Sequence, residues 1–206
     1  MDIKINTILS SNEFRLKEKG SVFDAYSFPS QNEIEAMEHL NSLKKKFYDA
    51  THHCYAYKFN SEKLRYSDDG EPNGTAGLRI LNAINHFELT YLIVIVVRYF
   101  GGTKLGVGPL GKAYYESALG CLENSEKITK ELYKRLTVTF PFELTNLTHN
   151  LLSKHSAKIE ETFYSDEQPQ IRAVMPFNHA NIFFEEILSQ SNGIVKTVFT
   201  DDKLYF

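Results

Sequence analysis

The sequence predicts an α+β chain of two domains, and three observations support this. Runs of strand length alternate with segments of helical periodicity through the first 130 residues. Tyr91–Val97 is continuously apolar, which is typical of a central strand covered on both faces. From Tyr133 onward shorter elements follow in a different order. We therefore expect one domain at residues 1–130 and another at residues 131–206, joined by the polar connection Ser125–Lys130.

The first helix is expected over about residues 31–47. Ser30 and Glu33 have the spacing of a capping box directly after Pro29. Apolar residues then recur at roughly helical spacing, namely Ile34, Met37, Leu40, Leu43 and Phe47.

A strand over Thr51–Phe59 should place alternate side chains on opposite faces. His53, Tyr55, Tyr57 and Phe59 share one face, and His52, Cys54 and Ala56 share the other. The segment Asp68–Gly74 has loop composition, and a second helix is expected from near Thr75. Its buried residues should be Ile80, Leu81, Ile84 and Phe87.

The central strand is expected to end at Gly101 and Gly102, and a third helix should follow a glycine-rich segment. The apolar positions of that helix are Leu110, Ala113, Tyr114, Ala118 and Leu122.

The second domain reads as strand, helix, strand, strand, helix, strand. Strands are expected around Leu136–Phe140, at Ile159–Tyr164, at Ile171–Met175 and at Val195–Phe199. A helix containing Leu144, Leu147 and Leu151 follows the first strand. Another begins at a capping Asn178 and stops at Asn192-Gly193. The order βαββαβ in about 75 residues predicts a ferredoxin-like sandwich.

Composition and charge exclude several classes of protein. No apolar run approaches the roughly 18–20 residues that span a bilayer. The N-terminus lacks the pattern of a secretory signal, and two separated cysteines form neither a disulfide framework nor a CxxC motif, so a cytoplasmic protein is expected. Residues 1–130 hold 16 Lys and Arg against 16 Asp and Glu, and residues 131–206 hold 7 against 10. This balance disfavours strong non-specific nucleic-acid binding.

The glycine-rich segment Gly106–Ala113 matches two nucleotide-binding patterns, G-x-G-x-x-G and G-x-x-x-x-G-K. Both matches are weak, because Ala113 stands where a Walker loop needs Ser or Thr for magnesium. A tight strand-to-helix turn is favoured. A phosphate- or nucleotide-binding module at the Gly101–Gly111 loop stays open as an alternative.

Two helix starts offer backbone N–H groups that attract anions. The first has Gly101, Gly102 and Lys104 nearby, with Arg98 at the strand end. The second is Gly74-Thr75, where Asp68, Asp69 and Glu71 oppose an anion. An anion pocket and close backbone packing are equally compatible with these glycines.

His52 and Cys54 share a strand face and precede a loop rich in carboxylates. This pattern suggests a hydrolase-type enzyme that uses His52, Cys54 and the Asp68–Glu71 loop, or a metal site there. A buried cysteine beside a hydrogen-bonded histidine is the commoner arrangement. We therefore assign no catalytic residue, no metal ligand and no cofactor from the sequence.

Three segments, Thr51–Tyr57, Ser67–Gly77 and Arg98–Gly106, together resemble the signature of the YigZ/IMPACT family over about residues 10–125. The resemblance implies an N-terminal domain like domain 2 of ribosomal protein S5 and a C-terminal domain like the last domain of elongation factor G. The chain departs from the family pattern at Arg79, where Pro is usual. It also departs at Gly108–Tyr114, where a Gly-Gly-Leu-Val-Arg-Ala-Tyr type run is usual.

The resemblance implies a non-enzymatic binding or regulatory protein linked to translation or stress. RNA, the ribosome or a regulatory protein are the expected partners, with a small anion or phosphate at the glycine-rich loop and no membrane partner. The candidate ligand-binding residues are His52, His53, Asp68, Asp69, Glu71, Gly74, Thr75, Arg98, Tyr99, Phe100, Gly101, Gly102 and Lys104.

Overall fold

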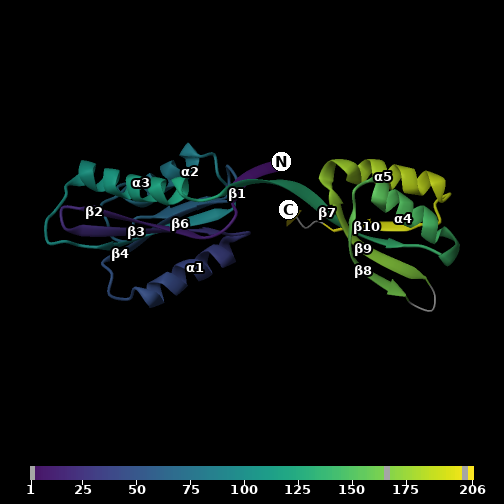
Figure 1. Cartoon of the computed structure of the whole chain (residues 1–206), viewed down its shortest axis with the longest axis horizontal. Helices are drawn as coiled ribbons and strands as arrows, with labels where there is room; N and C mark the ends of the chain where they lie inside the picture. Colours follow the sequence, from purple (N-terminus) through teal and green to yellow (C-terminus); the bar gives the residue numbers. More distant parts are fainter. Residues whose placement is uncertain (1–2, 165–167, 201–203) are drawn as a thin grey trace. The chain divides into compact units, whose positions relative to one another are not determined.

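A computed structural model describes residues 3–164, 168–200 and 204–206. The chain is of the α+β class, with helices packed on two sheets (Figure 1). It divides into a larger unit, Asn6–Thr129, and a smaller unit, which is Lys130–Phe206 together with the N-terminal residues up to Ile5. In the part of the chain that is described, no helix is long and apolar enough to cross a membrane.

The larger unit is built on a five-stranded sheet in which every neighbouring pair is antiparallel. Across the sheet the strands are β2 (Asn12–Glu18), β3 (Ser21–Pro29), β6 (Leu92–Tyr99), β4 (His52–Lys58) and β5 (Leu64–Ser67). The central position of β6 explains its unbroken run of apolar residues.

Helices cover both faces of this sheet (Figure 1). Helix α1 (Glu33–Lys46) lies on one face, and α2 (Gly77–His86) and α3 (Val107–Glu123) lie on the other. Side chains of β6 alternate between the two cores: Val94 and Val96 pack with α2 and α3, whereas Ile93 and Ile95 pack with α1. The prediction of a central strand covered on both faces is confirmed.

The predicted faces of β4 are also confirmed. Tyr55 and Tyr57 belong to the core under α1, and Cys54 and Ala56 belong to the core under α2 and α3. Because strand side chains alternate strictly, this places His52 on the α2 and α3 side and His53 on the α1 side.

The cap of α1 differs from the prediction. Asn32 is the N-cap, and its side chain accepts a hydrogen bond from the Glu35 N–H at 3.0 Å. The Glu35 carboxylate in turn accepts the Gln31 N–H at 2.6 Å. The Ser30–Glu33 capping box is therefore wrong by two residues, because Asn32 caps as well as Ser does and has a reciprocal glutamate at the same spacing.

Strands β1 (Lys4–Ile8), β2 and β3 precede the first element expected from the sequence, so none of the three is predicted. Strand β2 lies at the sheet edge and buries little, and β3 carries Asp24 near its middle. Asp24 is directly opposite Arg15 on β2, and the two side chains form an ion pair. The cross-strand ion pair thus neutralises the charge of Asp24 in β3. In the sequence, such polar residues obscure the apolar alternation by which a strand is recognised.

The smaller unit has the predicted order βαββαβ, formed by β7 (Lys127–Thr139), α4 (Thr145–Lys154), β8 (Lys158–Tyr164), β9 (Pro169–Pro176), α5 (Phe177–Gln190) and β10 (Lys196–Phe199). Strand β7 pairs antiparallel with both β9 and β10, and β9 pairs with β8. A short 3-10 turn, Phe142–Leu144, precedes α4, and the short strand β11 (Leu204–Tyr205) pairs with β7.

Two details of the prediction for this region are wrong. The expected polar connection Ser125–Lys130 is strand from Lys127 onward, because β7 begins there. Helix α5 begins at Phe177 after Pro176 and has no side-chain cap, so Asn178 lies inside the helix. Its predicted end is confirmed, because Gly193 has a positive φ of 77° and donates its N–H to the Leu188 carbonyl.

Candidate functional site

The three motif segments meet at one end of the larger sheet. Strands β4 and β6 are antiparallel, and their register places His52 opposite Arg98. The loop between β5 and α2 brings Glu71 to the same end, where its carboxylate contacts Arg98. The antiparallel register therefore brings together residues that are far apart in the sequence.

Glu71 is the centre of this cluster. One carboxylate oxygen, Oε1, accepts hydrogen bonds from Arg98 Nη1 and from the Tyr114 hydroxyl, the latter at 2.7 Å. The same oxygen lies 3.8 Å from His52 Nε2. The side chains of Glu71 and Arg98 are only 4% and 6% exposed, so this ion pair is buried. Arg98 is thus paired inside the protein and does not present its charge to a ligand.

Asp68 caps α2 across the loop. Its Oδ1 accepts the N–H groups of Ala76 and Gly77, both at 2.9 Å, and its Oδ2 accepts that of Gly74, also at 2.9 Å. Thr75 is buried, and its hydroxyl donates to the Pro72 carbonyl. The anion-attracting amides predicted at Gly74-Thr75 are therefore occupied within the protein, that of Gly74 by the Asp68 carboxylate and that of Thr75 by the Pro72 carbonyl.

Asp69 fixes the two histidines through its backbone and its side chain. His52 Nδ1 lies 2.7 Å from the Asp69 carbonyl oxygen. Because a carbonyl only accepts, Nδ1 carries the proton in this contact. The Asp69 carboxylate accepts the His53 N–H at 2.7 Å and lies 3.7 Å from Lys44 Nζ. Burial lowers the pKa of the His53 imidazole below its ordinary value.

Cys54 is a buried thiol with two polar neighbours. Its Sγ lies 3.0 Å from the Asp68 carbonyl and 3.4 Å from the Tyr114 hydroxyl. Burial raises the pKa of Cys54 well above the usual range for a thiol, and the nearby Glu71 adds to this. A protonated, buried thiol is a poor nucleophile, because the thiolate is the reactive form.

The segment after β6 forms an exposed edge beside the buried cluster. Gly101 contacts the β2–β3 turn so closely that an added Cβ would lie 1.9 Å from the Gly20 carbonyl carbon. Its N–H donates to Ser21 Oγ at 3.1 Å. Close backbone packing therefore accounts for Gly101. Gly102 and Lys104 are exposed, and Gly102 adopts a positive φ of 82°.

The aromatic residues of this segment are held by neighbouring loops. The Tyr99 hydroxyl donates to Asp49 at 3.0 Å, and the Phe100 N–H donates to Thr51 Oγ1 at 3.1 Å. Phe100 is 46% exposed as a residue, and the centroid of its ring lies 5.6 Å from the Arg98 guanidinium carbon. Phe100 thus presents an aromatic face to solvent over a fixed cation.

The two nucleotide-binding patterns fall largely inside a helix. Gly106 is the N-cap of α3, so the segment from Val107 to Lys112 is already helical. A Walker loop must wrap around phosphate before its helix begins. Residues 106–113 form no such loop, and the favoured interpretation, a tight strand-to-helix turn, is also wrong, because residues 100–106 connect β6 to α3 and the matched segment is the start of the helix.

Tyr114 and Ser21 belong to the cluster and were not among the predicted site residues. Tyr114 lies on α3 and reaches Glu71 and Cys54, and burial strongly raises the pKa of its hydroxyl. A tyrosine at a fully buried helix position needs a hydrogen-bond partner, which is the signal that sequence reasoning could have used. Ser21 lies in a strand that was not predicted. Its hydroxyl is 3.4 Å from Arg98 Nη2.

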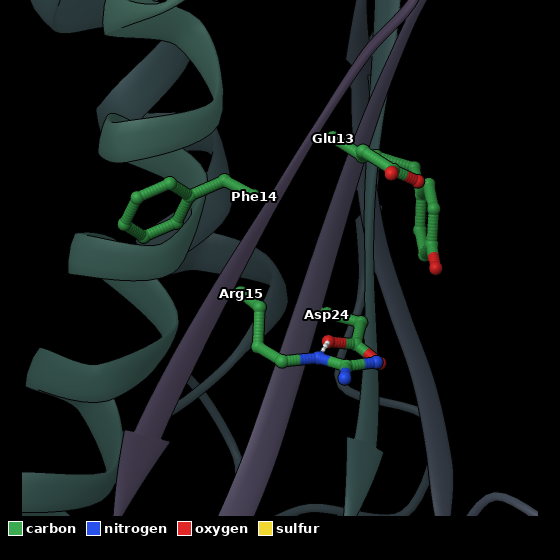
Figure 2. Close-up of a pocket in the computed structure, with 5 residues that line it drawn as sticks. Glu13, Phe14, Arg15 and Asp24 are labelled. Atoms are coloured by element: carbon green, nitrogen blue, oxygen red, sulfur yellow. Dashed lines mark hydrogen bonds and ion pairs between the residues drawn. The ribbon is translucent and has the colours of Figure 1, made fainter.

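A separate hollow lies against β2 and β3, and its lining residue Tyr26 belongs to the sheet face that α1 covers (Figure 2). Its volume is about 360 Å³, and its lining includes Glu13, Arg15, Asp24 and Tyr26. Arg15 points at Asp24 and binds it through two hydrogen bonds of 2.6 and 2.8 Å. Because these charges neutralise each other, the hollow offers little to attract a charged ligand. No cluster of three or more potential metal ligands occurs among the described residues.

Comparisons with known proteins connect this geometry to a family. The profile described as the Impact N-terminal domain matches residues 19–122. The protein YvyE of Bacillus subtilis, an IMPACT family member, is 29% identical over 189 residues, which cover 91% of this chain and 87% of that protein. An IMPACT family member of Thermus thermophilus is 36% identical over 143 residues, or 69% of this chain and 78% of that protein.

A solved structure has a similar fold. It is described as the crystal structure of an hypothetical protein and superposes with a TM-score of 0.74 at 24% identity. The superposition covers 98% of this chain and 100% of that one.

Proposed function

The chain belongs to the IMPACT family, and from this premise we propose that it is a non-enzymatic binding protein that regulates translation by contact with the ribosome. The proposed contact surface consists of the exposed segment after β6 and the adjoining β2–β3 turn. We call it the glycine rim and define it by Lys19, Phe100, Gly101, Gly102 and Lys104. The resemblance stated above supports a domain 2 fold of ribosomal protein S5 for the larger unit. The strand order β10, β7, β9, β8 supports a ferredoxin-like fold for the smaller unit.

One observation carries the proposal: the polar side chains of the motif segments are used internally, whereas the rim around them is exposed. Glu71 is occupied by Arg98 and Tyr114, and Asp68 is occupied by the α2 amides. These contacts connect three distant segments into one rigid support. A support of this kind is suited to holding a recognition surface in place.

The chemistry of the rim fits a ribosomal RNA contact. Phe100 offers an exposed ring for stacking on an unpaired base. Lys104 and Lys19 are exposed, and Lys19 lies in the β2–β3 turn next to Gly20, which touches Gly101. The net charge of −3 argues for a small local contact rather than an extended phosphate-binding face.

The hydrolase alternative is less well supported. His52, Cys54 and Glu71 do lie together, but Cys54 is fully buried and its thiol pKa is raised. Asp68 uses both carboxylate oxygens as a helix cap. Neither group is available for nucleophilic or acid–base chemistry on a substrate.

The test is co-sedimentation of the full chain with purified ribosomes at moderate salt. We expect the wild type to pellet with ribosomes and the double variant Phe100→Ala, Lys104→Glu to remain largely in the supernatant. The matched control is Lys63→Glu, an exposed charge reversal in the β4–β5 turn at the opposite end of β4.

Three outcomes would overturn the proposal. The first is that wild type and rim variant sediment equally with ribosomes, and the second is that the wild type does not sediment at all. Thermal melting of each variant checks that folding is unchanged. Binding of free RNA but not of ribosomes would also refute the ribosome as the partner.

A further inference from the structure

A second hollow lies between α2 and α3, away from the motif cluster. It has a volume of about 390 Å³ and is lined by Arg79, Asn82, Gly108, Gly111, Lys112 and Tyr115. This volume is within the roughly 300–1,000 Å³ of small-molecule sites. Every lining residue belongs to the larger unit.

The residues that line the hollow lie on one side of each helix. Arg79 and Asn82 are three residues apart on α2, and Lys112 and Tyr115 are three residues apart on α3, so each pair lies on one side of its helix. The opposite sides of both helices contribute to the core, for example Ile80 on α2. The polar sides are therefore left to form the hollow.

Gly111 gives Arg79 its position. A Cβ added at Gly111 would lie 3.2 Å from Arg79 Nε, closer than most side chains tolerate. The glycine lets the arginine side chain lie directly against α3.

The charges of the hollow favour an anion. Arg79 is exposed and makes no hydrogen bond or ion pair with any other described residue. Lys112 is 72% exposed at its side chain and has Glu116 at 3.5 Å, a weak surface pair. Among the residues that the structure describes, none of those lining the hollow is acidic.

The backbone adds to these charges. Helix α3 has no side-chain cap and no acidic residue in its first turn. Gly108 lies in that turn and lines the hollow, and as one of the first amides of α3 its N–H has no acceptor within the helix.

We propose that this hollow binds a phosphate group of a nucleotide, either free or within an RNA strand. The Arg79 guanidinium and the Lys112 ammonium hold the phosphate oxygens, and the Gly108 N–H adds a hydrogen bond at the positive end of α3. The half-buried ring of Tyr115 offers a surface for the base. The site is independent of the glycine rim.

The test is a titration of the isotope-labelled full chain, followed by the backbone amide signals of α2 and α3 in NMR spectra. Three probes are used separately: inorganic phosphate, adenosine monophosphate and a short single-stranded RNA. We expect the Gly108 and Gly111 amides to shift with at least one probe. The probe that binds tightest identifies the source of the phosphate.

Two variants test the residues. The double variant Arg79→Gln, Lys112→Gln removes both cations. It should lower the affinity for the tightest-binding probe by about tenfold or more, because charge-assisted hydrogen bonds are lost. Gly111→Val keeps both charges but displaces Arg79, and it should also weaken binding. The control, Lys17→Gln with Lys63→Gln, removes two exposed charges elsewhere in the same unit and should leave the affinity unchanged.

The inference is overturned if no probe shifts these amides in the wild type. It is equally overturned if the cation variant binds as tightly as the control, or if the control loses as much affinity as the cation variant. The melting temperature of each variant is measured alongside, so that a folding defect is recognised as such.

Discussion

At the scale of the residue, Glu71 determines whether the motif cluster is stable. It is the counter-charge of the buried Arg98 and accepts the Tyr114 hydroxyl. A buried ion pair contributes little over an apolar pair, but removing one partner leaves an unpaired charge in a medium of low polarity.

We therefore expect Glu71→Gln to lower the free energy of unfolding by about 3 kcal/mol or more, because Arg98 then keeps its charge without a counter-ion. Urea denaturation followed by circular dichroism measures this. The exposed Glu62→Gln is the control and should change stability by less than about 0.5 kcal/mol. Equal midpoints for Glu71→Gln and the control would contradict the role of Glu71.

His53 gives the larger unit a pH dependence. Burial lowers the pKa of its imidazole in the folded state from the ordinary value of 6.5, although nearby Asp69 opposes the shift. Below 6.5 the unfolded chain binds a proton that the folded chain binds less readily. This contribution to stability is complete above pH 6.5 and is lost as the pH falls from 6.5 through the lower folded-state pKa.

Replacing His53 by Gln removes this titration. We expect the urea midpoint of the wild type to fall more steeply than that of His53→Gln as the pH is lowered from about 7.5 to about 5.5. Other groups titrate in both proteins, so the difference between the two slopes isolates His53. Parallel slopes would show that burial does not perturb this histidine.

At the scale of the element, α2 depends on a carboxylate that lies outside the helix. Asp68 accepts the amides of Gly74, Ala76 and Gly77, and α2 has no cap from its own N-cap residue Ala76. Gly77 also packs so closely on β5 that an added Cβ would lie 2.7 Å from the backbone of Ser67. The start of α2 is thus fixed by tertiary contacts.

Asp68→Ala should destabilise the protein by about 2 kcal/mol, near the upper end for loss of a cap, because several amides lose their acceptor together. Amide hydrogen exchange should show the first turn of α2 opening more often. The comparison is Glu38→Ala, an exposed position on α1 with no capping role. A first turn that stays equally protected in both variants would rule out this account of α2.

At the scale of the whole molecule, each unit has its own hydrophobic core. The smaller unit is packed around Phe140, Phe183 and Ile187, whereas the larger unit has one core on each face of its sheet. All thirteen candidate site residues and the hollow between α2 and α3 lie in the larger unit. Both proposed binding functions therefore belong to that unit.

The sequence by itself determined the α+β class, the central strand β6, the two faces of β4 and the order of elements in the smaller unit. These features depend on local periodicity and on apolar runs, which a single sequence displays directly. The three motif segments were also found from the sequence, because their residues are close together along the chain. The first strands of the sheet were not predicted, because β2 is a largely exposed edge strand and β3 contains the charged residue Asp24.

Only the tertiary structure decided what the site residues do. The Glu71–Arg98 pair joins residues 27 apart in the sequence, and the Glu71–Tyr114 bond joins residues 43 apart. These contacts depend on strand register and helix packing, which no local pattern specifies. The same is true of Gly101 against Gly20 and of Arg79 against Gly111. Arg98 was expected from the sequence to bind a ligand, whereas in the structure it is the buried ion-pair partner of Glu71.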